Sequence, residues 1–222
     1  MRVVSLVPSV TESLLAWGVV PVAVTRFCEH PELPQVGGTK DPDIEQIVAL
    51  EPDLVVVNDE ENRKPDFDEL EARGLDVHVV RVTTVEDVAV AMEALARRVE
   101  CIYEPEPLPP RTELHVRAFV PIWRRPWMTM NRDTYGSSVL AHLGVDNVFA
   151  DAAERYPEVT LDSVPTVDAV LAPSEPYPFG PRHEDELRAL APVTFVDGKD
   201  LFWWGVRTPA ALVRLQESLK SR

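Results

Sequence analysis

Long hydrophobic runs and positive charge are both scarce in this chain of 222 residues. No apolar run reaches the roughly 18 residues that a membrane-spanning helix needs, so we predict no transmembrane helix. Lysine and arginine number 22 against 37 aspartates and glutamates, which gives a formal net charge of −15. Duplex nucleic acid and anionic membranes bind to clustered basic faces. We therefore expect neither nucleic-acid binding nor membrane insertion.

The sequence contains only two cysteines and shows no features of an export signal. The two cysteines, Cys28 and Cys101, lie far apart in the sequence, which favours two reduced thiols over a disulfide. Met1 leads directly into the alternating run MRVVSLVPS, without the apolar segment and small-residue cleavage site of a signal peptide. The sequence as written predicts a cytoplasmic protein, or an extracytoplasmic one if a signal has been removed.

The common catalytic motifs are missing. The segment QVGGTKDP lacks the spacing of a phosphate-binding P-loop, and no GxGxxG, HExxH, CxxC or GxSxG occurs. The five histidines are scattered, so spacing alone indicates no metal cluster. Because no motif pairs a nucleophile with a base, we predict that the protein is not an enzyme.

Strand-like and helix-like segments alternate along the chain, and the second half repeats the first. Two pairs of segments match at an offset of about 115 residues: IEQIVALEPDLVVVNDE with TLDSVPTVDAVLAPSEP, and FDELEARGLDVHVV with HEDELRALAPVTFVD. The repeat predicts an α/β protein with two Rossmann-like lobes, residues 1–99 and 116–222, each with a mainly parallel sheet. The alternative is one continuous doubly wound sheet.

The segment between the repeats, ECIYEPEPLPPRTE, contains four prolines and four glutamates. Proline cannot continue a helix, so residues 100–115 are predicted to be a single interlobe linker. A ligand cleft is expected between the two lobes. The loops after the carboxyl ends of the strands would then face this cleft.

Three loops of the first half carry candidate site residues. Ser9 in VPSVTE is interpreted as a helix N-cap, or as part of a helix N-terminus that offers backbone N–H groups to an anionic ligand. In RFCEHP, Phe27 is a candidate ligand contact, and Cys28 and His30 have the spacing to lie on one side of an extended segment. They are either ligands of a soft transition metal or a buried cysteine beside a surface histidine.

The third of these loops, NDEENRKPD, contains Glu60 and Glu61. Such an acidic run is either a solvated surface or a docking site for a basic partner.

Aromatic and arginine side chains gather in the second half, after three successive predicted strands. Tryptophan and arginine suit large planar or carboxylate-bearing ligands, although arginine stacked on tryptophan is also a purely structural arrangement. We predict that these loops bind a ligand. The candidates are Trp123, Arg124, Arg125, Trp127, Arg132 and Tyr135 in residues 120–138, Tyr177 and Phe179 in residues 174–183, and Trp203 and Trp204 in DLFWWG.

Several of these segments together resemble a known family. The first half carries RVVSLVPSVTESLLAWG, VTRFCEHP and VGGTKDPDIEQIVALEPDLVVVNDEENR, and the second half carries PIWRRPWMT, DTYGSSVLAHLG and RYPEVTLDSV. The whole pattern resembles the cluster-III solute-binding proteins of ABC importers, the helical-backbone metal receptors, in their cobalamin-binding-protein-like branch.

The resemblance implies two α/β lobes with a metal chelate held between them. It also implies docking of acidic residues onto an ABC permease, for which Glu60 or Glu61 and Glu175 or Glu184 are the nearest candidates by position. No intrinsic cofactor is implied, because cobalamin, haem or a ferric siderophore would be the ligand.

We therefore predict a non-catalytic binding protein for a bulky metal chelate, with a corrinoid first and haem or a ferric siderophore next. The alternative is a cytosolic enzyme or chaperone that handles a corrinoid or metal chelate on the same fold. The missing export signal favours this alternative, and the missing catalytic motifs weigh against it.

Overall fold

The computed structural model describes residues 1–112 and 114–220, which form two compact units. Unit 1 comprises Met1–Val82 and Glu86–Pro105, and unit 2 comprises Thr83–Val85 and Glu106–Arg222. The segment 83–85, predicted in the first lobe, thus belongs to unit 2, and the predicted linker divides after Pro105. Glu113 of the predicted linker, and Ser221 and Arg222 of the predicted second lobe, lie outside the described residues.

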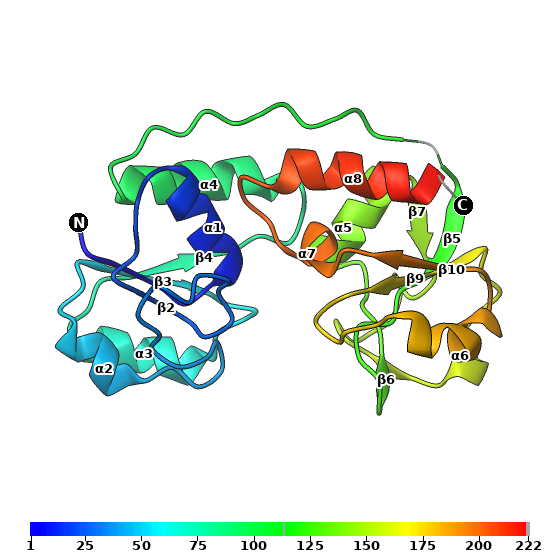
Figure 1. The fold of residues 1–222 in the computed structure, drawn as a ribbon, viewed down its shortest axis with the longest axis horizontal. Coiled ribbons are helices and arrows are strands. Elements are labelled where there is room, and N and C mark those ends of the chain that lie inside the picture. Colours follow the sequence, from blue (N-terminus) through cyan, green and yellow to red (C-terminus); the bar gives the residue numbers. More distant parts are fainter. Residues whose placement is uncertain (113, 221–222) are drawn as a thin grey trace. The chain divides into compact units, whose positions relative to one another are not determined.

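Unit 1 is a parallel four-stranded sheet in the order β2-β1-β3-β4, with helices between successive strands (Figure 1). Its elements are β1 (Val3–Ser5), α1 (Pro8–Ala16), β2 (Ala23–Val24), α2 (Ile44–Ala49), β3 (Leu54–Asn58), α3 (Lys64–Ala72), β4 (Val77–Val80) and α4 (Asp87–Arg98).

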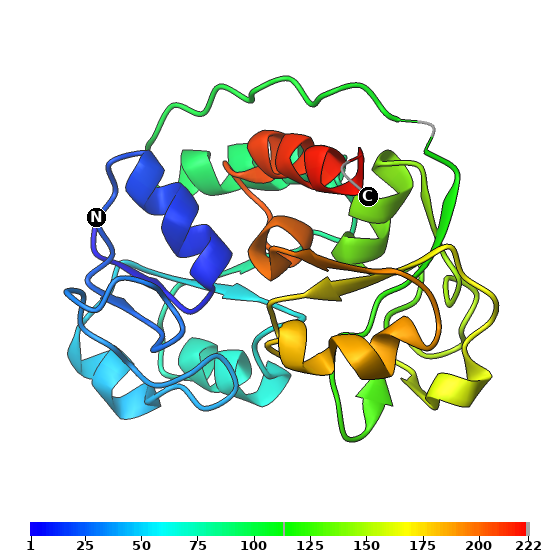
Figure 2. The same cartoon turned by 45° about the vertical axis from the view of Figure 1, so that its right-hand side comes forward.

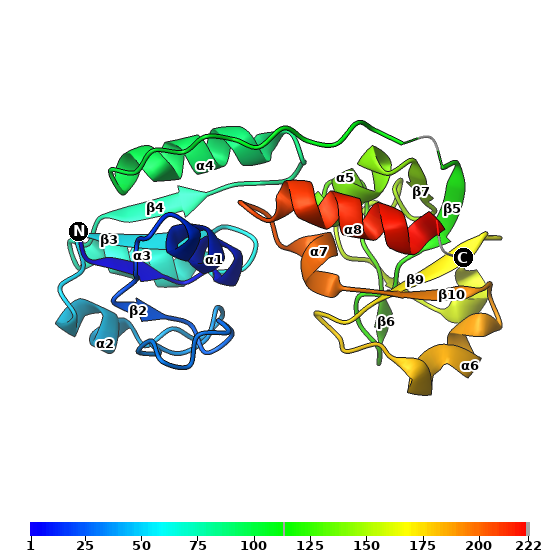
Figure 3. The same cartoon turned by 45° about the horizontal axis from the view of Figure 1, so that its top comes forward.

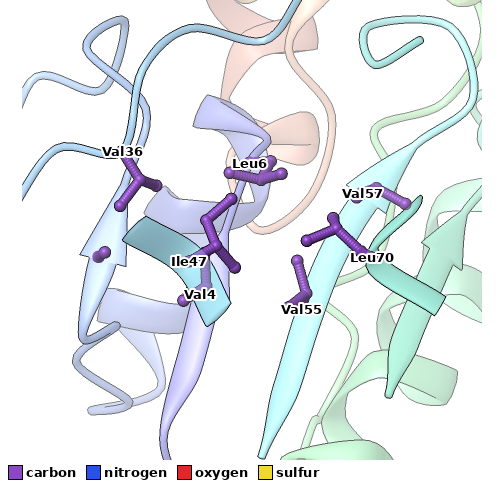
Figure 4. Packing of buried hydrophobic residues seen from close by; sticks show 8 residues of the cluster. Val4, Leu6, Val36, Ile47, Val55, Val57 and Leu70 are labelled. Atoms are coloured by element: carbon purple, nitrogen blue, oxygen red, sulfur yellow. The ribbon is translucent and has the colours of Figure 1, made fainter. Parts of the chain in front are cut away.

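The central strands β1 and β3 are buried on both faces, as expected of a parallel sheet covered by helices. Side chains alternate between the faces, so Val4 and Val55 point to the layer of α2 and α3, where they meet Ile47 and Leu70 (Figure 4). The helices α1 and α4 cover the opposite face (Figure 1). Burial of this apolar layer is what holds the short strands in one register.

The first helix begins earlier than the sequence suggests. We interpreted Ser9 as its N-cap, but α1 begins at Pro8, and the cap position is Val7, which makes no side-chain capping bond. Proline suits the first helical position because its φ is already helical and the N–H it lacks would have no partner there. The interpretation of Ser9 as a cap is therefore wrong.

Unit 2 repeats the architecture of unit 1. Its main sheet is parallel in the order β10-β9-β5-β7, so counting strands within each unit gives the same order, 2-1-3-4, in both. The elements of unit 2 are β5 (Val116–Phe119), β6 (Trp127–Met128), α5 (Tyr135–His142), β7 (Val145–Asn147), β8 (Glu158–Val159), the 3₁₀ turn η1 (Leu161–Ser163), β9 (Ala169–Pro173), the 3₁₀ turn η2 (Pro181–His183), α6 (Glu184–Arg188), β10 (Val193–Val196), α7 (Gly198–Phe202) and α8 (Thr208–Lys220).

The equivalent strands stand at the predicted offset. β3 begins at Leu54 and β9 at Ala169, while β4 begins at Val77 and β10 at Val193, a separation of about 115 residues in each case. The predicted fold class, two α/β lobes with parallel sheets, is confirmed for both units. One difference is that the counterpart of α2 has contracted to the short turn η1.

Two features of unit 2 are not apparent from the repeat. A two-stranded antiparallel sheet joins β6 to β8 outside the main sheet, with Trp127 paired to Val159. The terminal helix α8 packs against α7 and β10 and covers the face of the sheet opposite α6 (Figures 2 and 3). Among the described residues, no helix has the length and apolar character required to cross a membrane.

The predicted linker is irregular in structure but makes specific contacts at its two ends. In unit 1, Tyr103 packs on Trp17 with ring centroids 5.6 Å apart. In unit 2, the Thr112 hydroxyl donates a hydrogen bond to the carbonyl of Leu143 at 2.7 Å, and His142 bonds the Pro109 carbonyl at 2.8 Å. The Thr112 bond satisfies a backbone carbonyl at the end of α5, and the His142 side chain satisfies one in the linker.

Because α3 packs its buried side chains against the sheet, shortening one of them should destabilise unit 1. Leu70 is fully buried, and replacement by alanine is expected to destabilise the unit by about 2–5 kcal/mol through lost burial and a residual cavity. Hydrogen exchange followed by mass spectrometry should show faster exchange in β1 and β3. Val90→Ala is the matched control because Val90 is 68% exposed on α4. Equal exchange in the two variants would contradict this account of the core.

Candidate functional site

The aromatic loops of unit 2 follow two neighbouring strands at the centre of its sheet. β5 pairs with both β7 and β9, so the order of connection reverses between β5 and β9. In open parallel sheets the loops at the carboxyl ends of two such strands leave a crevice where ligands bind. Residues 120–134 and 174–180 are these loops, and they carry most of the predicted ligand contacts.

Four aromatic rings from these two loops form one cluster. Trp127 stacks on Phe179 with centroids 5.9 Å apart and an interplanar angle of 8°. Tyr177 lies 4.7 Å from Phe179, and the Trp123 ring meets Tyr177 edge to face at 5.7 Å. We call this set, Trp123, Trp127, Tyr177 and Phe179, the aromatic cluster.

The members of the aromatic cluster differ in exposure. Phe179 is only 6% exposed and belongs to the hydrophobic core formed with Phe119 and Leu187, and Trp127 is partly buried against that core. Trp123, by contrast, is 43% exposed. The inner pair therefore holds the cluster to the unit, while Trp123 and the partly buried Tyr177 supply the surface that a ligand can reach.

Arg124 stiffens the same surface. Its guanidinium lies over the Trp127 ring at 5.7 Å and donates two hydrogen bonds to one oxygen of the Glu186 carboxylate, at 2.9 and 3.0 Å. Hydrogen bonding to Glu186, with a smaller contribution from Tyr177, raises the pKa of Arg124 above its ordinary value. Arg124 therefore remains charged and held in place. Its neighbour Arg125 is exposed and has a φ of 70°.

A histidine that the sequence analysis did not select completes the cluster. His183, at the end of η2, is 5% exposed and lies 5.5 Å from the Tyr177 ring and 5.4 Å from the Phe179 ring. Its Nδ1 accepts a hydrogen bond from the Gly180 backbone at 3.2 Å. Burial, followed by the charges of Arg182 and Arg124, lowers the pKa of His183, which favours the neutral ring.

A second aromatic and cationic group lies after β10. The Trp203 ring has Lys199 at 5.2 Å and Arg207 at 5.4 Å from its centroid. The buried Asp200 carboxylate accepts two hydrogen bonds from Arg214, at 2.6 and 2.7 Å, and lies 3.7 Å from Arg207. This ion-pair network holds Arg207 beside the partly buried Trp203.

Two further predicted ligand contacts, Trp204 and Tyr135, are buried. Trp204 is buried in the core, and Tyr135 is buried with its hydroxyl 3.0 Å from Thr208. Burial also raises the pKa of Tyr135. Both side chains support α7 and α8 rather than facing outward.

The loops after β9 and β10 are joined by a close backbone approach. Gly198, at the start of α7, donates its N–H to the Ser174 hydroxyl at 3.0 Å. A Cβ at this position would lie 2.5 Å from both the Glu175 backbone nitrogen and its Cγ, and 2.7 Å from its carbonyl oxygen. The absence of a side chain at Gly198 therefore allows the Tyr177 loop to sit against the helix that precedes Trp203.

Arg132 belongs to a different part of unit 2. It forms an ion pair with Asp151 and donates to the Ala150 carbonyl at 3.2 Å. With Ser138 and Asn147 it lines a groove of about 400 Å³ between α5 and the edge strand β7. No contact joins it to the aromatic cluster among the interactions of the described residues.

The candidates of unit 1 are dispersed. Ser9 is 1% exposed in the first turn of α1, and Phe27 is exposed beneath Arg26 at 5.2 Å. The Cys28 sulfur lies 3.3 Å from the Thr11 hydroxyl, whereas His30 pairs with Glu32 at the surface at 3.0 Å. This arrangement corresponds to the alternative of a buried cysteine beside a surface histidine.

No metal centre emerges around these side chains. Within residues 1–112 and 114–220, no group of three or more histidine, cysteine, aspartate or glutamate side chains is arranged to hold a metal ion. Cys28 and Cys101 are both free thiols.

The acidic docking candidates lie in ordered loops. The side-chain oxygen of Asn58 accepts hydrogen bonds from the backbone N–H groups of Glu60 and Glu61, both at 3.0 Å, and Lys40 donates to the Glu60 carbonyl at 2.7 Å. In unit 2, Glu184 pairs with Arg188 at the start of α6, and Glu175 packs against Gly198.

Comparisons with known proteins agree with this fold. A family model described as periplasmic binding protein matches residues 3–104. A vitamin B12-binding protein of Salmonella paratyphi A is 29% identical over 73% of this chain and 68% of its own length. One of Vibrio parahaemolyticus is also 29% identical, over 74% of this chain and 67% of its length.

Solved structures show the same fold over nearly the whole chain. The periplasmic vitamin B12-binding protein BtuF of Vibrio cholerae matches with a TM-score of 0.79 at 21% identity, covering 99% of this chain and 96% of that one. The periplasmic haem-binding protein HutB of Vibrio cholerae matches with a TM-score of 0.74 at 20% identity, covering 99% and 98%.

Two doubly wound units, of which unit 2 has an aromatic and cationic surface beyond its strand ends, place the chain in the two-lobed α/β fold class. The match to the family described as periplasmic binding protein covers residues 3–104, which lie in the first half of the chain. The predicted resemblance to the cluster-III solute-binding proteins, in their cobalamin-binding-protein-like branch, is confirmed by these matches.

Because the Glu175 backbone lies so close to Gly198, adding a single methyl group at Gly198 should lower the stability of unit 2. Gly198→Ala should destabilise unit 2 by about 1–3 kcal/mol, because the backbone of Glu175 cannot move aside without displacing the Tyr177 loop. Urea unfolding followed by tryptophan fluorescence measures the effect, since Trp123, Trp127, Trp203 and Trp204 all lie in unit 2. Gly180→Ala is the control, with no heavy atom within 4 Å of the added Cβ, and equal destabilisation by both would contradict the packing argument.

Proposed function

We propose that this protein is a non-catalytic binding protein for a bulky metal chelate, and that its ligand is a corrinoid. The proposal places the ligand contact of unit 2 on the aromatic cluster and the adjoining cationic side chains. The observation that carries it is the combination of the exposed Trp123 ring with Tyr177 and Arg124 at the switch point of the unit 2 sheet.

The exposed rings suit a large, flat, partly apolar ligand. Aromatic side chains give extensive contact area at little cost in conformational entropy, and Trp123 and Tyr177 are already held edge to face. Phe179 and Trp127 lie behind them and fix their position. A ligand would therefore meet a surface that needs little reorganisation, which favours affinity.

The cations of unit 2 suit the polar periphery of such a ligand. Exposed Arg125 is available to meet amide, phosphate or carboxylate groups. Lys199 and Arg207 around Trp203 provide a second polar and aromatic contact. A corrinoid presents a broad ring and many amide and phosphate oxygens, which matches this mixture of contacts.

The sequence relatives set the order of candidate ligands. Proteins named as vitamin B12-binding are 29% identical to this chain. Haem-binding proteins share its fold at lower identity, for example HutB at 20%. We therefore place a corrinoid first and haem or a ferric siderophore next.

Delivery to an ABC permease is the corresponding cellular role. Glu60 or Glu61 on unit 1 and Glu175 or Glu184 on unit 2 are the proposed docking residues. The Asn58 side chain holds the backbone of Glu60 and Glu61 in a tight turn, as a docking surface requires. Glu175, in the loop after β9, and Glu184, at the start of α6, are both partly buried, so their backbone is also well supported.

Equilibrium dialysis of the full chain against cyanocobalamin, cobinamide, haemin and a ferric siderophore tests the function. We expect saturable binding of a corrinoid, and about 30-fold weaker binding by Trp123→Ala, which is the effect of losing a hot-spot aromatic worth roughly 2 kcal/mol. Trp17→Phe should bind as the unchanged protein does, because Trp17 packs on Tyr103 at the end of α1. Saturation by haemin alone would replace the corrinoid with haem, and saturation by none of the four would refute the proposal.

A further inference from the structure

The hydrogen bond from Gly180 determines which nitrogen of His183 carries the proton. A backbone N–H can only donate, and the Gly180 nitrogen lies 3.2 Å from His183 Nδ1. Nδ1 must therefore be unprotonated, and the hydrogen of the neutral ring is on Nε2. The buried ring, 5% exposed, is held between this backbone group and the aromatic cluster.

The tautomer of His183 sets the role of Tyr177. His183 Nε2 lies 3.4 Å from the Tyr177 hydroxyl, so the Nε2–H points a donor at the phenolic oxygen. The Arg124 guanidinium lies close enough to the same Tyr177 side chain to interact with it. With the Nε2–H donor on its oxygen, Tyr177 keeps its own O–H hydrogen for an acceptor outside the cluster.

We propose that His183 is a positioning residue that holds the Tyr177 hydroxyl as a hydrogen-bond donor to an acceptor oxygen of the ligand. This inference rests on the proposed function. It identifies a polar, oriented contact within a surface that is otherwise aromatic. An amide, phosphate or carboxylate oxygen is the matching ligand group.

Several charged groups face His183 from the elements around it. Arg182 precedes it in η2, Arg124 approaches from the loop after β5, and Glu186 lies on α6. Burial and the two arginines outweigh the backbone of Gly180 and the charge of Glu186, which raise the pKa of His183, so this pKa lies below its ordinary value of 6.5. The neutral ring is therefore the form that supports the cluster at neutral pH.

Protonation would undo the arrangement. A proton on Nδ1 would face the Gly180 N–H, so their hydrogen bond would be replaced by repulsion. Because the folded unit binds this proton less readily than the unfolded chain does, the stabilisation is complete above pH 6.5 and declines as the pH falls through the lowered pKa. Ligand affinity should decline over the same pH range.

Two substitutions separate the two hydrogen bonds of His183. His183→Gln keeps a donor near the position of Nε2 but cannot be protonated, whereas His183→Asn reaches Gly180 but not Tyr177. For cyanocobalamin at pH 7.5, we expect affinity within about twofold for the glutamine variant and about 2- to 10-fold weaker for the asparagine variant, the effect of one hydrogen bond. From pH 7.5 to 5.5 the unchanged protein should weaken, while both variants should stay nearly constant.

A control without ligand separates this inference from the proposed function. In the free protein, the indole N–H resonances of Trp123 and Trp127, assigned with Trp→Phe variants, should shift with the midpoint of the His183 titration. His78→Gln is the matched control, because burial also lowers the pKa of His78, in β4 of unit 1.

The outcomes are distinct. If cyanocobalamin does not bind, the proposed function fails. If the indole resonances nevertheless shift with the His183 titration, the positioning of the cluster by His183 stands, and the acceptor oxygen belongs to another ligand. If cyanocobalamin binds but the resonances ignore His183, or both variants bind as tightly as the unchanged protein, the positioning role is overturned. Should His183→Gln fail to fold, Tyr177→Phe removes the same contact and should weaken binding about 2- to 10-fold.

Discussion

The packing of Phe179 is the contact on which the candidate site depends. Its ring is buried in the core cluster of unit 2 that includes Leu187 of α6, and it also contacts Trp127, Tyr177 and His183. The same burial that stabilises the unit therefore fixes the rings that a ligand would meet. A loop without such a buried residue would present the same aromatics in many orientations, and binding would require their ordering.

The arrangement of the strands places that packing where it is useful. In both units the chain begins in a central strand, adds the second strand on one side and the third on the other. The loops after the first and third strands then separate at the carboxyl edge. In unit 2 these loops carry the aromatic cluster. In unit 1, Asn62 of the loop after β3 donates to the carbonyl of Leu6, after β1, and to that of Thr39, between β2 and α2. One topology thus supports a ring-lined surface in one repeat and a hydrogen-bonded turn in the other.

Sequence patterns predicted the candidate site only in part. The loops after β5, β9 and β10 were recognisable because tryptophan, tyrosine and arginine follow apolar strands there. The pattern could not distinguish exposed Trp123 from Trp127, which stacks on Phe179, or separate Trp203 from buried Trp204. His183, Glu186 and Gly198 lacked any local signal, because their roles depend on partners 3 to 62 residues away, brought close by the fold.

Local sequence alone determined the alternation of helices and strands within the repeat and the parallel character of the two main sheets. Alternating apolar segments, prolines and glycines act over a few residues, and their effect can be read directly from the chain. The tertiary structure decided which aromatic rings became core and which remained accessible, and which nitrogen of His183 carries its proton. Those properties depend on burial and hydrogen bonding between separate loops, because only the folded packing brings Gly180, Tyr177 and Arg124 around one buried ring.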